Sequence, residues 1–200
     1  MFLTMVAEKE LAWEQCDIVS AYLHAAIKGR HVYMRQPTGF NNGKKGQVCQ
    51  LQKALYGIRQ AAFLWYETFR VELQNMGFSS IDEDPCVFHN TDKTAWIAIY
   101  VDDCLLAATE AATIDKLKRN LDQKFGLKAI GEPARFLGCS VTRDYKRKTI
   151  TLSQATYVEE TLKIAGMLHC SANKVPMNPG YRSNSSSNSN NNGDIDVAVY

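Results

Sequence analysis

The chain has 200 residues, 46% hydrophobic and 22% charged, which is enough for about one domain. Its 23 Lys and Arg against 21 Asp and Glu give a net charge of +2, so a global cationic field is excluded and any binding of nucleic acid has to come from a local arrangement of charge. The apolar runs 96–101 and 104–108 are shorter than the roughly 18 residues of a membrane span, and charges at positions 8–10 interrupt any signal-peptide pattern, so we expect a soluble, intracellular and cytoplasmic protein.

The N-terminal third predicts short, mixed elements. Residues 13–19 and 31–35 favour strands, because β-branched and aromatic residues are frequent in both stretches. Residues 20–28 between them are compatible with a helical turn or two.

Two later segments predict amphipathic helices, since their apolar residues recur every three or four positions. The first runs from about Ile58 to Met76 and the second from about Glu110 to Phe125. Glycine follows each segment, at Gly77 and Gly126, and glycine is the residue typical of a helix C-terminus.

Between these helices the sequence predicts two consecutive hairpins. Residues 86–89 and 96–101 favour strands joined by the polar loop 90–94. A third apolar run, 104–108, follows at once, so Asp102-Asp103 are expected at the tight turn of the second hairpin.

The C-terminal part predicts a third hairpin and a short helix. Strands are expected at 136–142 and 149–152 around the polar loop 143–148, and Ser153 predicts the N-cap of a helix that ends near Gly166. These elements together indicate an α+β fold in which helices cover one face of an antiparallel sheet.

The composition changes near the end of the chain, where residues 183–192 are only Ser and Asn. Such a stretch buries too little apolar surface to repay its ordering, so we expect disorder there. The predicted organisation is a folded domain at 1–178 and a low-complexity tail at 179–200.

The six cysteines are widely scattered and include no CxxC pair. A chain of this size with ample apolar residues does not depend on disulfides, so we expect free thiols and no zinc site. The residues are Cys16, Cys49, Cys86, Cys104, Cys139 and Cys170.

The acidic pair Asp102-Asp103 is a candidate metal site. Adjacent like charges cost free energy unless a cation lies between them, and carboxylates without nearby His or Cys favour magnesium. Asp17 also lies at the end of a predicted strand, and carboxylates from neighbouring strands can hold two ions roughly 3.5 to 4 Å apart for phosphoryl transfer. Spacing alone leaves open the alternative of an ordinary solvated turn.

Several motifs then occur in the order of a known family. Tyr100-Val-Asp-Asp103 resembles the YxDD box of reverse transcriptases, and Asp17-Ile-Val-Ser-Ala-Tyr22 resembles their first carboxylate motif. Over about residues 13–178 the chain resembles the copia-type long-terminal-repeat retrotransposon polymerases, which implies the palm of a right-hand polymerase with a partial thumb. Further stretches carry this resemblance: 21–25, 32–40, 48–62, 65–66, 84–88, 136–138 and 152–154.

The resemblance implies an RNA-directed DNA polymerase with a two-metal site. Asp17, Asp102 and Asp103 match the family's metal-binding carboxylates, and the backbone carbonyl of Ile18 is implied as a further ligand of the two Mg²⁺ or Mn²⁺ ions. The implied partners are an RNA template, a DNA primer and deoxynucleoside triphosphates. For an intact element of this family the implied location is a cytoplasmic virus-like particle.

The same resemblance assigns four residues to the nucleotide. Tyr22 matches the aromatic steric gate beneath the sugar, and Gly57 lets the backbone approach the substrate. Gln60 lies in the template- and nucleotide-contacting box, and Tyr100 opens the YxDD box. A core tyrosine at position 22 and a solvated helix glutamine at position 60 are the alternatives.

A basic cluster falls in the third predicted hairpin, whose start at 136–138 resembles the family's primer grip. Four cations in six positions are able to follow primer phosphates with a salt-dependent affinity, and a solvated polar turn is the alternative. The four are Arg143, Lys146, Arg147 and Lys148.

The chain also departs from the family. Only sixteen residues precede Asp17, whereas the family has an upstream fingers segment whose cations hold the triphosphate. Ala62 stands where the family has Pro, and Ala25 where it has Gly. Integrase, protease and ribonuclease H motifs are not expected in this chain. Because the cations of the fingers are missing, a second interpretation is a non-catalytic, truncated remnant that keeps the palm fold and weak nucleic-acid binding.

Overall fold

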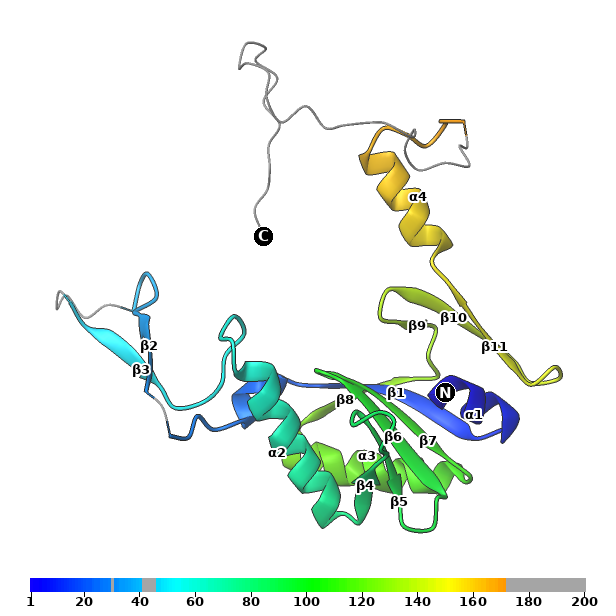
Figure 1. Cartoon of the computed structure of the whole chain (residues 1–200), viewed down its shortest axis with the longest axis horizontal. Coiled ribbons are helices and arrows are strands. Elements are labelled where there is room, and N and C mark those ends of the chain that lie inside the picture. Colours follow the sequence, from blue (N-terminus) through cyan, green and yellow to red (C-terminus); the bar gives the residue numbers. More distant parts are fainter. Residues whose placement is uncertain (30, 41–45, 172–200) are drawn as a thin grey trace. The chain divides into compact units, whose positions relative to one another are not determined.

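The computed structural model describes residues 1–29, 31–40 and 46–171 (Figure 1). It divides into two compact units, 1–158 and 159–200, and the second is described only as far as residue 171. The predicted tail at 179–200 lies outside the described residues.

A six-stranded antiparallel sheet forms the centre of the first unit, with the strand order β4-β5-β6-β7-β1-β8. The alternation of apolar residues within these short strands gives the sheet two buried faces. The strands are β1 (Ala12–Ile18), β4 (Phe78–Ser80), β5 (Val87–Asn90), β6 (Ala95–Tyr100), β7 (Asp103–Ala108) and β8 (Leu127–Gly131).

Two long helices cover one face of this sheet, α2 (Ala61–Asn75) and α3 (Ala111–Phe125) (Figure 1). Trp65 of α2 packs edge-on against Phe125 of α3, with 5.2 Å between ring centroids. Both helices are confirmed as predicted. The first begins three residues later than expected, because Ile58 lies in a turn whose carbonyl accepts the N–H of Ala61.

A short helix and a small sheet cover part of the other face. The helix α1 (Phe2–Glu8) buries Phe2 and Val6 against the sheet. The small sheet has the order β11-β10-β9, and its strands are β9 (Arg135–Phe136), β10 (Cys139–Asp144) and β11 (Thr149–Ser153).

The predicted strand 136–142 is wrong as a single strand. Leu137 and Gly138 both have positive φ, +48° and +77°, and consecutive positive φ values make a tight hairpin turn. The chain therefore reverses between β9 and β10. The third hairpin is formed by β10 and β11, as predicted.

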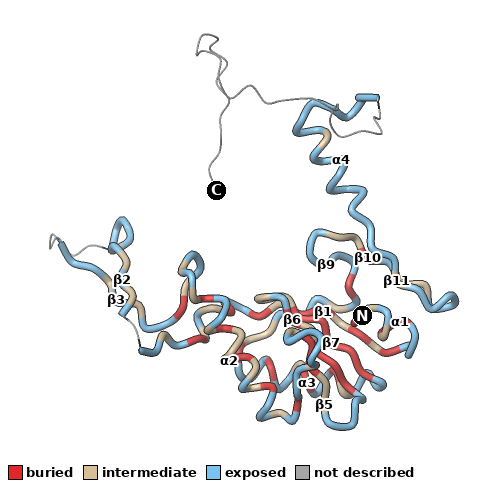
Figure 2. Tube along the Cα trace, viewed as in Figure 1, coloured by how far each residue is buried: buried red, intermediate tan, exposed pale blue. Residues whose placement is uncertain are grey.

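The remaining elements are peripheral to the central sheet. The 3₁₀ helix η1 (Ala21–His24) is shorter than the helix expected at 20–28. A two-stranded ribbon of β2 (Val32–Arg35) and β3 (Val48–Leu51) follows it. α4 (Ala155–Ile164) begins where Ser153 Oγ accepts the N–H of Ala155 at 3.3 Å. Figure 2 shows that buried residues concentrate in the central sheet and its flanking helices, whereas the ribbon is mostly exposed.

The architecture confirms an α+β fold with helices on one face of an antiparallel sheet. Among the elements of the described residues, α1, β3, β4 and β8 were not predicted.

Candidate active site

Asp17 and Asp103 are directly opposed residues of the antiparallel pair β1 and β7. Directly opposed residues have Cβ atoms about 4.5 to 5.5 Å apart, so carboxylates from distant parts of the chain are neighbours here. Cys16 and Ile18 of β1 are buried in the core beneath α2 and α3. Since successive side chains of a strand point to opposite faces, Asp17 lies on the face away from these helices.

The turn between β6 and β7 is held from two sides. Val101 has a φ of +58°, and its carbonyl accepts a 2.6 Å hydrogen bond from Nε1 of Trp65 in α2. The carbonyl of Asp102 accepts the N–H of Ile18 at 2.8 Å. Asp102 thus lies in the turn, whereas Asp103 is the first residue of β7 and pairs with Tyr100, a refinement of the prediction that both aspartates occupy the turn.

Two neutral side chains orient the carboxylates. Nε2 of Gln15 donates to Oδ1 of Asp103 at 3.2 Å, and the Tyr56 hydroxyl donates to Oδ2 of Asp102 at 3.0 Å. Gln15 is only 6% exposed, so its amide is a buried polar group directed at the acidic pair. Neither donor carries a positive charge, so they position the carboxylates without neutralising them.

The electrostatics of the site are those of crowded negative charge. The pKa of Asp17 is raised above its ordinary value, first by burial and then by the charges of Asp102 and Asp103, while Lys128 acts in the opposite direction. Burial, the hydrogen bond to Asp102 and the charge of Asp102 raise the pKa of Tyr56 to about 12. A cation bound between these carboxylates would relieve the repulsion that raises the pKa of Asp17.

The donor set has the chemistry that a divalent ion requires. It consists of hard carboxylate oxygens that repel one another, which suits Mg²⁺ or Mn²⁺. Within the described residues, no three His, Cys, Asp or Glu side chains converge as ligands of one ion. Asp102 and Asp103 each direct one oxygen to a protein donor. Residue types and strand register fit the expected metals, and Asp17, Asp102 and Asp103 are the residues that would hold them.

The predicted nucleotide residues fall into two groups. The ring of Tyr22 packs on that of Tyr56 with centroids 4.3 Å apart. Because Tyr56 bonds Asp102, Tyr22 is connected to the acidic site through Tyr56. Tyr22 is also half-buried against the core, which fits part of the core-tyrosine alternative. Tyr100 is 59% exposed and faces Asp103 across the hairpin.

Gly57 and Gln60 lie between Tyr56 and α2. Gly57 has a φ of +92° with open space where a Cβ would be, so this position requires glycine for its backbone conformation. Gln60 immediately precedes α2 and lines a hollow of about 370 Å³ together with Ile27 and Phe63. The three aspartates do not line this hollow.

The structure places Arg143 in β10 and the other three members of the basic cluster in the turn that follows this strand. The guanidinium of Arg143 donates to the carbonyls of Leu11 at 2.8 Å and Val6 at 3.3 Å, and it lies 4.3 Å from the ring centroid of Tyr145. Arg143 therefore ties β10 to α1 and to the start of β1.

The other members of the cluster are more accessible. Arg147 pairs with Asp144 at 3.8 Å and Lys148 pairs with Glu10 at 2.8 Å, both on the surface. Across the part of the chain that the structure describes, the Lys146 ammonium forms no ion pair. Contacts with primer phosphates stay a prediction for all four residues, Arg143, Lys146, Arg147 and Lys148.

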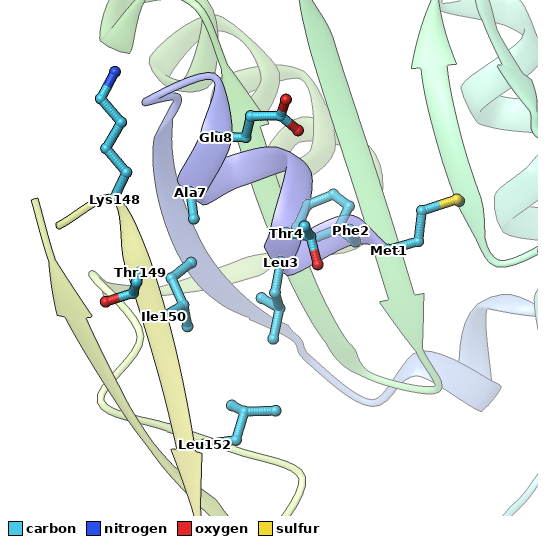
Figure 3. Close-up of a pocket in the computed structure, with 10 residues that line it drawn as sticks. All are labelled: Met1, Phe2, Leu3, Thr4, Ala7, Glu8, Lys148, Thr149, Ile150 and Leu152. Atoms are coloured by element: carbon cyan, nitrogen blue, oxygen red, sulfur yellow. The ribbon is translucent and has the colours of Figure 1, made fainter.

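A separate hollow of about 740 Å³ lies between α1 and β11 (Figure 3). Its lining is mainly apolar and includes Leu3, Ile150 and Leu152, with Lys148 at one side (Figure 3). It contains none of the three aspartates and is not part of the acidic site.

Sequence reasoning missed Gln15, and it did not single out Tyr56 from its motif. The signal for Gln15 is its position two residues before Asp17 in a strand, because such residues share a face. Tyr56 carries no comparable local signal, since its partner is 46 positions away.

An antiparallel sheet with helices on one face and carboxylates on the other is the arrangement expected of a polymerase palm. The chain belongs to the reverse transcriptase (RNA-dependent DNA polymerase) family, whose sequence profile matches residues 1–179. The resemblance to copia-type retrotransposon polymerases is confirmed by its relatives.

Three of its relatives are much longer polyproteins. The retrovirus-related Pol polyprotein from transposon TNT 1-94 of Nicotiana tabacum is 32% identical over 88% of this chain and 13% of its own length. The corresponding polyprotein from transposon RE1 of Arabidopsis thaliana is 30% identical over 88% of this chain and 12% of its own length. The transposon Ty1-GR1 Gag-Pol polyprotein of Saccharomyces cerevisiae is 35% identical over 61% of this chain and 7% of its own length. This chain therefore spans about one eighth of the plant polyproteins.

Among the described residues, no helix has both the length and the apolar character to cross a membrane.

Proposed function

We propose that this chain supplies the palm of an RNA-directed DNA polymerase and transfers nucleotides to a primer 3′-hydroxyl by a two-metal mechanism. The observation that carries the proposal is the register of β1 against β7, which opposes Asp17 to Asp103 while the backbone of Ile18 bonds Asp102 beside them. RNA template, DNA primer and deoxynucleoside triphosphates are the corresponding partners, and a cytoplasmic virus-like particle is the proposed location.

Each residue has a defined task in this mechanism. Asp17, Asp102 and Asp103 would hold the ions, with the Ile18 carbonyl as a further ligand. When bound, such ions lower the pKa of the attacking hydroxyl and stabilise the pyrophosphate leaving group. Gln15 and Tyr56 orient two of the carboxylates and leave their charge available.

The nucleotide sugar would lie against the tyrosine pair. Tyr22 and Tyr56 place two rings beside Asp102, and a ring beneath the sugar leaves no room for a 2′-hydroxyl. This arrangement favours deoxynucleotides by steric exclusion rather than by a hydrogen bond.

A non-catalytic remnant is the second candidate. It is favoured by the observation that Asp102 and Asp103 each accept a hydrogen bond from the protein in place of converging on one point. A remnant of this kind would keep the palm fold and bind nucleic acid weakly.

Metal-dependent stability tests the site directly. Mn²⁺ or Mg²⁺ should raise the melting temperature of the wild-type chain, since a ligand that binds only the native state stabilises it by mass action. Asp102→Asn should lose most of this shift, and Asp92→Asn, which changes an exposed loop aspartate, should keep it. No shift in folded wild-type protein would contradict the metal site.

Primer extension then separates the polymerase from the remnant. On a poly(rA) template with an oligo(dT) primer, weak extension that Asp103→Asn abolishes would support the proposed reaction. Folded protein that binds metal but does not extend the primer would favour the remnant.

A further inference from the structure

The small net charge of the chain conceals a strong separation of charge along the sequence. Between Asp17 and Glu67 there is no acidic residue, and this stretch holds seven Lys and Arg. The rest of the chain carries 16 Lys and Arg against all 21 Asp and Glu. One continuous segment is therefore distinctly basic, and the remainder is acidic.

The β2–β3 ribbon is built from this segment. His31, Tyr33 and Arg35 are alternate residues at and within β2, and all three are exposed. Alternate residues of a strand lie on one face, about 7 Å apart. Tyr33 lies opposite Gln50, and Arg35 lies opposite Val48. We call these five residues the ribbon face.

The ribbon face is ordered but open. Nε2 of Gln50 and Nδ1 of His31 are 2.7 Å apart, and the His31 ring lies 6.3 Å from the Tyr33 ring at 30°. Tyr33 is nevertheless 57% exposed. The hydrogen bond between Gln50 and His31 thus orders one end of the ribbon face, while the ring of Tyr33 stays accessible.

Four described cations in and beside the ribbon carry no acidic partner in an ion pair. Lys28, Arg35, Lys53 and Arg59 are exposed, and over the described part of the chain none of them forms an ion pair. A positive surface that no carboxylate neutralises is complementary to a polyanion.

The other face of the ribbon has a different role. Val32, Met34, Cys49 and Leu51 are half-buried, and Val32 lines a hollow with Ile58 and Phe63 at the start of α2. The apolar face is thus the less exposed side of the ribbon, and the ribbon face is the side open to solvent.

The base of the ribbon is tied to the candidate active site. The N–H of Ile27 bonds the carbonyl of Gln52, and the N–H of Ala54 bonds that of Ala25 at 2.8 Å. Tyr22 precedes this stem and Tyr56 follows it, and these two rings are in contact beside Asp102. Both ends of the ribbon segment are therefore connected to the tyrosine pair, Tyr22 and Tyr56.

We infer that the ribbon face binds single-stranded nucleic acid. A base stacks on the ring of Tyr33, and the guanidinium of Arg35 contacts a phosphate of the nucleic-acid backbone. Aromatic rings interleaved with cations are the arrangement by which proteins hold unpaired strands without sequence preference. The inference rests on the proposed function and extends it, because it names where unpaired template leading into the active site is held.

Binding of a fluorescent oligonucleotide, measured by anisotropy with the full chain and without metal or nucleotide, tests this inference. Tyr33→Ala should weaken binding about 5- to 150-fold, the range for loss of one stacked base, while Tyr33→Phe should retain most of it. Arg35→Ala should lower the slope of log Kd against log salt by about 0.7, the value for one phosphate contact on a single strand.

Arg119→Ala removes an exposed arginine from α3 and should leave both quantities unchanged, which controls for net charge. Equal binding by wild type and Tyr33→Ala, with both folded by circular dichroism, would overturn the inference. So would a change of oligomeric state in Tyr33→Ala with unchanged oligonucleotide binding, because the face would then contact protein. A chain that binds through Tyr33 but neither binds metal nor extends a primer would support the ribbon face and contradict the proposed function.

Discussion

The Tyr56 hydroxyl donates a 3.0 Å hydrogen bond to Oδ2 of Asp102, across 46 positions of the chain. This bond joins the ring that packs on Tyr22 to one of the three carboxylates. Tyr56→Phe keeps the ring and removes only the hydroxyl, so it isolates the contribution of the bond.

We expect Tyr56→Phe to lower the free energy of unfolding by about 0.5 to 1 kcal/mol at neutral pH, because the bond is partly exposed. The pKa of Tyr56 is raised to about 12, so the stability it contributes is complete below about pH 10, the ordinary value, and is lost as the pH rises through 12. Urea unfolding at pH 7 and across this alkaline range should show the difference between variant and wild type shrinking. A constant difference would argue against the Asp102 bond as its source.

Asp17→Asn should stabilise the metal-free protein at neutral pH. The pKa of Asp17 is raised, so the native state binds its proton more tightly than the unfolded chain, and stability falls as the pH rises above the ordinary value of 3.8. Asp17→Asn has no carboxyl group to titrate at this position, so its stability does not fall in this way. The difference in stability between the variant and wild type should therefore disappear in acid. Thermal unfolding with EDTA from pH 3 to pH 7 measures this, with Asp92→Asn as the control. A variant that is less stable than wild type at pH 7 would contradict the repulsion.

Tyr22→Ala should weaken the discrimination between deoxynucleotides and ribonucleotides. If the ring excludes a 2′-hydroxyl, its removal should narrow the preference for dTTP over UTP by tenfold or more, and each 1.4 kcal/mol corresponds to about tenfold. Binding of the two nucleotides with Mn²⁺ and primer-template provides the readout, and Tyr22→Phe should behave as wild type. The lost ring contact with Tyr56 should cost about 0.5 to 1.5 kcal/mol of stability. A drop of about 3 to 5 kcal/mol with unchanged preference would instead identify a core tyrosine.

Cys16 and Cys104 should resist alkylation in the folded protein. They are buried partners in the register of β1 and β7, burial raises the pKa of Cys16 to about 11, and burial also raises the pKa of Cys104. Thiolate is the reactive form, so iodoacetamide at pH 8 should label the exposed Cys170 first. Mass spectrometry should find labels on Cys16 and Cys104 only after denaturation. Early labelling of either would mean that the pair β1–β7 opens readily.

The expectation of free cysteines is confirmed, as is the general architecture. Apolar spacing predicted α2 and α3 because a helix that covers a sheet must present a continuous stripe to it. The two hairpins around 86–108 followed from alternating β-branched residues and a polar loop. The acidic motifs pointed to Asp17, Asp102 and Asp103 through their residue type and through the family resemblance.

Other features depend on partners that local pattern does not show. β8 is only five residues long and does not alternate strictly between apolar and polar residues, and it pairs with β1 in the sheet. The turn between β9 and β10 places Leu137, a non-glycine residue, at positive φ, and the neighbouring sequence does not predict this. In both cases contacts made elsewhere in the fold outweigh local propensity.

The sequence by itself determined the two covering helices, the central hairpins and the types of residue at the acidic site. Only the tertiary structure decided how these residues meet: Gln15 bonds Asp103 across 88 positions, and Arg143 bonds the Leu11 carbonyl across 132. The physical reason is that helices and hairpins arise from periodicities of a few residues, whereas a hydrogen bond between distant side chains exists only after strand register and helix packing have brought them together.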